Sequence, residues 1–219
     1  MNKTYDLVIF DWEGTLGDTL GPILTAVASE AKRMGLGNID EQGARGCVSL
    51  GLPRAVNKLF PNLSLHQHAH LIEAVQVALA SHSSDVCLMP GALPLIQQLH
   101  AQGVQLGIAT NKGQHSLQRV LHMSGLDQFF KVTRAAGQVP LKPCPQMLEE
   151  ILDAFGMQAS QSLMIGDSVA DIEMASAIAM DSIGVDFYHQ QTQELLAAGA
   201  LKVFDDYQQV HRFLQLREE

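Results

Sequence analysis

The segment Leu7–Thr15, with the sequence LVIFDWEGT, decides how the rest of the chain is interpreted. Its four leading apolar residues favour β-structure and predict a buried strand, which stops at the carboxylate of Asp11 shortly before the turn-forming Gly14. A carboxylate at the end of a rigid strand, with Glu13 two residues on, can act as a nucleophile or as a metal ligand. An ordinary strand that ends in a polar turn has the same local sequence, because Asp and Gly are common in turns. Residues elsewhere in the chain must therefore decide between the two interpretations.

The composition is that of a folded, acidic protein. Of the 219 residues, 47% are hydrophobic, and the formal net charge is −9, which argues against nucleic acid and anionic membranes as non-specific partners. The three cysteines, Cys47, Cys87 and Cys144, are far apart and lack metal-ligand spacing, as is typical of free thiols in a reducing compartment. The apolar run before Asp11 is too short for a signal peptide or a membrane span. We therefore expect a cytoplasmic monomer or homodimer that binds neither membranes nor nucleic acid.

The apolar patterns divide the chain into two parts. Residues 17–85 carry only helical patterns, including a capping-box pair, Ser64 and Gln67, before an apolar helical series. Later in the chain, predicted helices alternate with predicted strands at residues 104–109, 132–135, 162–165, 182–185 and 202–204. This alternation predicts a doubly wound parallel α/β sheet of Rossmann type. Residues 1–16 and 86–219 are expected to form that α/β domain, with residues 17–85 inserted as a helical domain.

Several polar residues are predicted to meet at one edge of the sheet. In open parallel sheets, the ligand crevice lies at the carboxyl ends of the strands. The residues that follow predicted strands, or enter from a loop at that edge, are Asp11, Thr110, Asn111, Lys142, Asp167 and Asp171. We therefore expect a single site built from four distant segments.

These segments resemble the four motifs of the haloacid dehalogenase superfamily of phosphohydrolases, and the chain is most similar to the phosphoglycolate phosphatase-like members. The first motif, Asp-x-Asp-Gly-Thr, is matched by Asp11–Thr15 with Glu13 in place of the second Asp, and the second, a Thr or Ser after a strand, by Thr110. The third, a lysine, is matched by Lys142, and the fourth, Gly-Asp-x-x-x-Asp, by Gly166–Asp171. The resemblance covers nearly the whole chain, and four motifs in the same order make coincidence a poor explanation.

The resemblance implies a magnesium-dependent nucleophile. Asp11 would attack phosphorus to form an aspartyl-phosphate, and Glu13 would serve as the acid and base. Mg²⁺ would be held by Asp11, the backbone carbonyl of Glu13 and Asp167, a set of oxygen ligands that suits a hard divalent cation. Asp171 would lie behind these ligands and fix the geometry of the metal's waters or of Lys142.

The resemblance also implies groups that bind phosphate and select the substrate. The hydroxyl of Thr110, the backbone N–H of Asn111 and the positive charge of Lys142 would bind the phosphoryl group. The inserted residues 17–85 resemble the cap of the family, a lid that excludes water and selects the substrate. In this cap, Arg45 is expected to bind a carboxylate or a second phosphate of the substrate.

The chain departs from the family pattern at Glu13, at Ala179 and at Phe187-Tyr188, where relatives usually have a second glycine. Glu13 keeps the carboxyl group of the usual acid but adds a methylene, and a misplacement of about 1 Å can cost on the order of a hundredfold in rate. Ala179 stands where relatives usually have a helix-capping glycine, which we expect to cost about 1 kcal/mol without affecting a catalytic role.

The motifs together predict a Mg²⁺-dependent phosphomonoester hydrolase. Its substrate would be a small phosphorylated metabolite, as for phosphoglycolate phosphatases, and Glu13 would slow its turnover. Two alternatives stay open at this stage: a sugar-phosphate mutase, because the same acid could return a phosphoryl group to a sugar, and a phosphate-binding sensor with weak catalysis.

Overall fold

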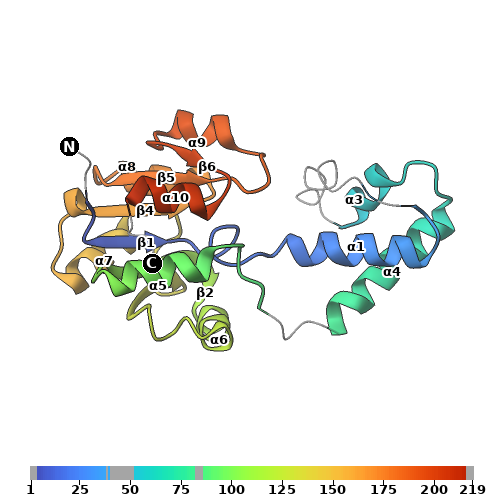
Figure 1. Ribbon diagram of the computed structural model, residues 1–219, viewed down its shortest axis with the longest axis horizontal. Helices are drawn as coiled ribbons and strands as arrows, with labels where there is room; N and C mark the ends of the chain where they lie inside the picture. Colours follow the sequence, from blue (N-terminus) through green and yellow to red (C-terminus); the bar gives the residue numbers. More distant parts are fainter. Residues whose placement is uncertain (1–3, 38, 40–51, 82–85, 216–219) are drawn as a thin grey trace. The chain divides into compact units, whose positions relative to one another are not determined.

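The computed structural model of the chain describes residues 4–37, 39, 52–81 and 86–215, and it divides into two compact units. We call the unit formed by Met1–Gly17 and Leu88–Glu219 the core unit, and the unit formed by Asp18–Cys87 the helical unit. Figure 1 shows the elements of each unit in chain order. The role of the helical unit as a cap that selects substrates stays a prediction.

The core unit is built on a six-stranded parallel sheet with the strand order β3-β2-β1-β4-β5-β6. Figure 1 labels these strands except β3. Its strands are β1 (Leu7–Phe10), β2 (Gln105–Gly113), β3 (Val132–Ala136), β4 (Ser162–Gly166), β5 (Asp181–Val185) and β6 (Val203–Phe204). Along the chain, β2 and β3 are added on one side of β1, and β4, β5 and β6 are then added on the other side. The predicted doubly wound α/β sheet is confirmed, and the direction of winding reverses between β1 and β4, where ligands bind in such sheets.

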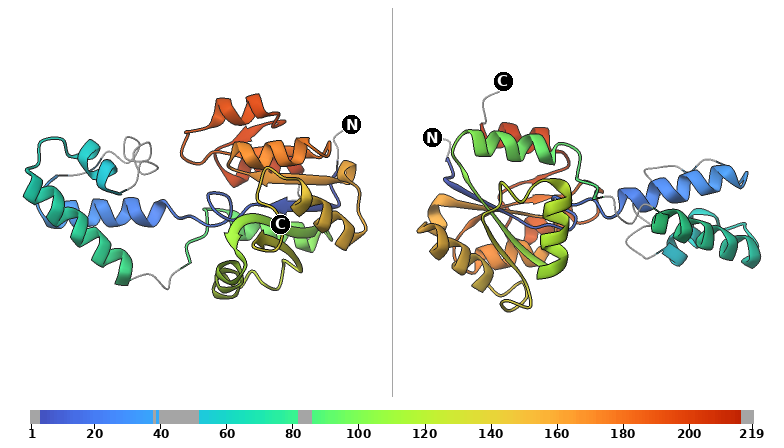
Figure 2. Two further views of the ribbon diagram at one scale, coloured as in Figure 1. Left: turned by 180° about the vertical axis from the view of Figure 1, so that it is seen from behind. Right: turned by 90° about the horizontal axis from the view of Figure 1, so that it is seen from below.

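Helices cover both faces of the sheet (Figure 2). They are α5 (Ala92–Ala101), α6 (Gln114–Ser124), α7 (Gln146–Phe155), α8 (Val169–Ser176), α9 (Thr192–Ala198) and α10 (Tyr207–Leu214), with a short 3₁₀ helix at Ala159–Gln161. Every residue of β1 is buried. Leu7 and Ile9 pack in one cluster with Ile151 of α7 and Met174 of α8. The continuous apolar run of β1 follows from this burial on both faces.

The helical unit contains α1 (Gly21–Arg33), α3 (Leu52–Leu59) and α4 (Leu65–Ser81). Its buried core consists of Val27, Ala31, Val56, Leu71 and Val75. The predicted capping box is confirmed, because the Ser64 N–H donates to Oε1 of Gln67 (2.9 Å) and the Gln67 N–H donates to Oγ of Ser64 (3.3 Å). Arg45, which is expected to bind the substrate, lies outside the described residues.

Two local features of the core unit qualify the sequence-based expectations. β2 does not end at residue 109 but continues to Gly113, with a shift of its pairing to β3 between Thr110 and Gly113. Thr110 and Asn111 therefore lie within an irregular end of β2 and not after it. Ala179 has a φ of 53°, the left-handed conformation that the usual glycine would adopt more easily.

Over the described part of the chain, no helix combines the length and apolarity that crossing a membrane requires.

Candidate active site

Asp11 lies at the carboxyl end of β1, at the point where the winding of the sheet reverses. Its N–H donates to the carbonyl oxygen of Ile165 in β4 (2.9 Å), and its side chain is largely buried. The following turn requires Gly14, which has a φ of 71° and at which an added Cβ would overlap the Asp167 carboxylate. The turn after β1 thus packs directly against the residue that follows β4.

Lys142 joins two carboxylates in the interior of the site. Its Nζ lies 2.6 Å from Oδ1 of Asp11 and 2.5 Å from Oδ1 of Asp171. The side chains of Lys142, Asp11 and Asp171 are 3%, 9% and 0% exposed, so solvent screens these contacts little. Burial opposes the charge of Lys142, but the two carboxylates outweigh it and raise the Lys142 pKa. The lysine is therefore held charged beside Asp11.

Asp171 is fixed at the first turn of α8. Its Oδ2 accepts hydrogen bonds from the Ser168 N–H (3.0 Å) and the Ser168 hydroxyl (2.6 Å), and its Oδ1 accepts from Lys142. Gly166 is required here, because a Cβ at that position would overlap the Asp171 side chain. Both oxygens of Asp171 are occupied within the protein, which suits a residue that positions Lys142 better than a direct metal ligand.

Three carboxylates converge where the winding reverses. One oxygen from each of Asp11, Asp167 and Asp171 lies within 4.8 Å of the others. Burial, followed by the charges of Asp11 and Asp171, raises the pKa of Asp167 to about 8. Burial and the charge of Asp171 raise the pKa of Asp11 to about 6, against the opposing effect of Lys142.

The charge balance of this cluster suits a divalent cation. When all three carboxylates are ionised, they leave a net charge of −2 after Lys142 is counted. Thr15, which is buried, also orients one ligand candidate, because its hydroxyl donates to Oδ1 of Asp167 (3.3 Å). Buried oxygen ligands with excess negative charge match the preference of a hard cation such as Mg²⁺.

The irregular end of β2 brings the predicted phosphate-binding residues to the same edge. Thr110 is buried, and its Oγ1 accepts a hydrogen bond from the Lys112 N–H (3.2 Å). The Asn111 side chain has a role that sequence reasoning did not foresee, because its Oδ1 accepts from the Lys142 N–H (3.0 Å). Asn111 thereby ties the end of β2 to the loop that carries Lys142.

Glu13 is paired with a residue that the sequence analysis missed. Lys112 Nζ donates to Oε1 of Glu13 at 2.5 Å, and the two side chains are 22% and 41% exposed. The position of Lys112 two residues after Thr110, on the strand that pairs with β1, is the signal that could have identified it.

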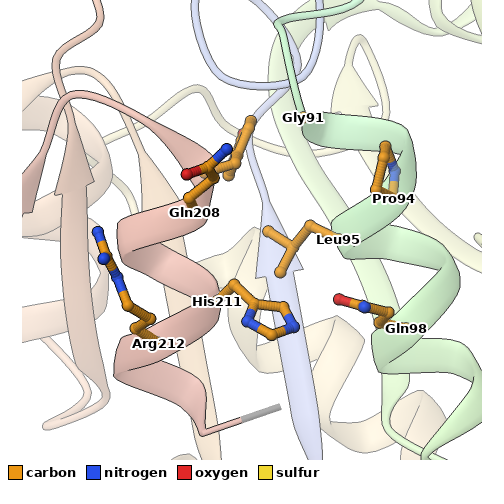
Figure 3. Close-up of a pocket in the computed structure, with 8 residues that line it drawn as sticks. Gly91, Pro94, Leu95, Gln98, Gln208, His211 and Arg212 are labelled. Atoms are coloured by element: carbon orange, nitrogen blue, oxygen red, sulfur yellow. The ribbon is translucent and has the colours of Figure 1, made fainter. Parts of the chain in front are cut away.

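Tyr207 was also missed, although it supports the turn after β1. It is buried at the start of α10, and its hydroxyl donates to the Thr15 carbonyl oxygen (2.6 Å). Beside Tyr207, a groove of about 300 Å³ lies between α10 and α5, with Leu95 and His211 between the two helices (Figure 3). Its lining includes none of the carboxylates, so it is a separate concavity.

Comparison with known proteins identifies the family. Residues 8–185 match the model of the haloacid dehalogenase-like hydrolases. Phosphoglycolate phosphatase from Rhodospirillum rubrum is 31% identical over 210 residues, covering 91% of this chain and 87% of that protein. Phosphoglycolate phosphatase from Synechococcus elongatus is 27% identical over 191 residues, covering 87% and 88% of the two chains.

A solved structure has the same fold at lower sequence identity. The crystal structure of a hydrolase from Streptococcus pneumoniae matches 82% of this chain and 91% of that chain with a TM-score of 0.68 and 20% identity. Fold, buried carboxylate cluster and sequence similarity therefore agree. The chain belongs to the haloacid dehalogenase-like hydrolase family and is a phosphatase of that family.

Proposed function

We propose that the chain is a Mg²⁺-dependent phosphomonoester hydrolase that acts on a small phosphorylated metabolite through an aspartyl-phosphate on Asp11. The observation that carries this proposal is the contact of 2.6 Å between the buried Asp11 carboxylate and Lys142. A buried carboxylate with one oxygen bound by a fixed cation is oriented for attack, and the cation reduces the repulsion between the carboxylate and an approaching phosphate.

The proposed metal ligands are the carboxylates of Asp11 and Asp167 and the backbone carbonyl of Glu13. The short distances within the carboxylate cluster support this assignment, as does the net charge of −2 that the cluster and Lys142 carry when all three carboxylates are ionised. When bound, Mg²⁺ neutralises negative charge on the phosphoryl oxygens and on the carboxylates. Asp171 would hold Lys142 in place, and because both of its oxygens already accept hydrogen bonds within the protein, it is not proposed as a direct ligand.

The proposed reaction has two halves. In the first, an Asp11 oxygen forms a bond to phosphorus, the bond from phosphorus to the ester oxygen breaks, and Glu13 donates a proton to the departing alkoxide. In the second, Glu13 takes a proton from a water molecule whose oxygen attacks the phosphorus of the aspartyl-phosphate. Inorganic phosphate leaves, and the Asp11 carboxylate is regenerated.

The phosphoryl group is proposed to bind at the carboxyl ends of β1 and β2. The Thr110 hydroxyl, the Asn111 N–H and the Lys142 ammonium group stabilise its oxygens as charge develops in the transition state. The adjacency of Thr110 and Asn111 on β2 and the hydrogen bond from the Lys142 N–H to Asn111 support this grouping.

The proposed substrate is phosphoglycolate or a phosphate ester of similar size. The activity of the two relatives named above supports this choice. Arg45 in the helical unit would bind the carboxylate of such a substrate. If Arg45→Ala leaves KM unchanged for every substrate that is hydrolysed, this assignment should be dropped.

The decisive experiment measures phosphate release from a panel of phosphomonoesters, with and without Mg²⁺. The panel contains 2-phosphoglycolate, several sugar phosphates and p-nitrophenyl phosphate, and Asp11→Asn serves as the inactive control. We expect Mg²⁺-dependent release that Asp11→Asn abolishes. Interconversion of sugar phosphates without phosphate release would instead indicate a mutase. Ligand-induced stabilisation without turnover would indicate a sensor, and either result would overturn the proposal.

A further inference from the structure

Lys112 connects the end of β2 to the proposed acid and base. Its Nζ donates to Oε1 of Glu13 at 2.5 Å, across 99 positions of sequence. β1 and β2 are neighbours, with Phe10 aligned to Ile108, so the residues that follow this pair along the two segments meet at one edge. The pair therefore joins the turn after β1 to the strand that carries the proposed phosphate-binding residues.

The irregular end of β2 positions Lys112 for this contact. The pairing of β2 with β3 shifts between Thr110 and Gly113, and such irregularities redirect side chains at the ends of strands. The Lys112 N–H donates to Oγ1 of Thr110, and the adjacent Asn111 accepts from the Lys142 N–H. The backbone leading into Lys112 is thus held by residues of the site.

The ion pair between Lys112 and Glu13 fixes the position of the Glu13 carboxyl group more than it stabilises the fold. With 22% and 41% of the two side chains exposed, solvent weakens the attraction between the charges. Glutamate has one more rotatable bond than aspartate, so an unrestrained Glu13 carboxyl group would sample more positions. A fixed ammonium group at one of its oxygens restricts those positions.

We infer that Lys112 is a positioning residue for Glu13: by anchoring the carboxyl group at the end of β2, Lys112 offsets part of the cost of the extra methylene. The inference rests on the proposed function of Glu13 as acid and base. It predicts that replacing Lys112 lowers kcat more when residue 13 is glutamate than when it is the shorter aspartate. The shorter aspartate, which matches the family motif, would need no such anchor.

The test is a double-mutant cycle of Lys112→Met and Glu13→Asp, measured as kcat and KM with Mg²⁺ and the best substrate of the panel. We expect Lys112→Met to lower kcat by about tenfold or more in the Glu13 protein and by less than about threefold in the Glu13→Asp protein, with KM nearly constant. Lys131→Met removes an exposed lysine of the core unit, and we expect it to change neither constant.

Equal losses of kcat in both backgrounds would overturn the inference, as would an unchanged kcat for Lys112→Met. A rise in KM of the same size in both backgrounds would also overturn it, because Lys112 would then bind the substrate directly.

Crystal structures of the wild type and Lys112→Met provide a readout that needs no turnover. We expect the Glu13 carboxyl group to occupy one position in the wild type and several in the variant; one shared position would contradict us. A wild type without phosphatase activity would therefore reject the proposed function while these structures still decide the role of Lys112.

Discussion

The ammonium group of Lys142 contacts the Asp11 carboxylate at 2.6 Å, and the two residues are separated by 131 positions of sequence. The contact is buried, and Lys142 is shared with Asp171. Its removal would leave negative charges together in the interior without their counterion.

Lys142→Met should therefore weaken both activity and stability. We expect kcat to fall by about a hundredfold or more, because a preorganised charge at the phosphoryl group is lost. Without added Mg²⁺, we expect the free energy of unfolding to fall by about 3 kcal/mol, as for a broken buried ion pair. Steady-state kinetics and chemical denaturation check the two effects. Unfolding at the same denaturant concentration as the wild type would contradict the structural role of the pair.

Ser168→Ala should lower both the free energy of unfolding and kcat, whereas a matched serine variant in the helical unit should lower only the free energy of unfolding. The change removes the hydroxyl that binds Asp171 and half of a capping box, with an expected loss of about 1 kcal/mol. Ser64→Ala removes the matching hydroxyl of the capping box in the helical unit and should cost a similar amount. We expect only Ser168→Ala to lower kcat, by about tenfold, because only that serine supports a residue of the site. Equal kcat values in the two variants would count against a positioning role for Asp171.

The stabilisation by Mg²⁺ should grow with pH. The folded-state pKa values of Asp167 and Asp11, about 8 and about 6, lie above the ordinary value of 3.8. The folded protein therefore binds more protons than the unfolded chain, and the stability that these groups contribute below about pH 4 is lost as the pH rises toward about 8. Thermal melting across this range, with and without Mg²⁺, measures the effect.

A bound divalent cation competes with those protons and replaces them at high pH. We therefore expect the increase in Tm on adding Mg²⁺ to be larger at pH 8 than at pH 5, and to be lost in Asp167→Asn. An increase of the same size at every pH would show that Mg²⁺ binds elsewhere.

Ala179→Gly should stabilise the protein. Ala179 has a φ of 53°, where glycine avoids the steric cost of a Cβ. After the greater freedom of glycine in the unfolded chain is allowed for, we expect a gain of about 0.5 to 1 kcal/mol, or about 2 °C in Tm. Ala177→Gly is the matched control, because Ala177 has a φ of −59° and glycine should destabilise the chain there. A lower Tm for Ala179→Gly would refute the cap argument.

Glu13→Asp should raise kcat on an alkyl phosphate. The shorter side chain restores the acid of the family motif, and a correction of about 1 Å can be worth on the order of a hundredfold in rate. The backbone carbonyl of residue 13 is unaffected, so the dependence on Mg²⁺ should stay the same. An unchanged or lower kcat would mean that Glu13 is already placed well.

The fold and most of the site could be predicted because their signals are local. The apolar run of β1 and the Gly-Asp pair after β4 each lie within one short segment, and the strand-end rule then brings them together. The pairs between Lys112 and Glu13 and between Tyr207 and Thr15 each join residues that are far apart in sequence. The position of Lys112 after Thr110 indicates the first pair only once β1 and β2 are known to be neighbours. The extension of β2 past residue 109 was missed for a related reason: its pairing with β3 is decided across strands.

The central place of β1 has a consequence for the synthesis of the protein. Asp11 leaves the ribosome more than a hundred residues before the β4 strand beside it and the lysine that binds it. The hydroxyl that holds the Thr15 carbonyl comes later still, from residue 207. A nascent chain therefore carries the proposed nucleophile long before it can use it, and activity should emerge only after residue 207 has been synthesised.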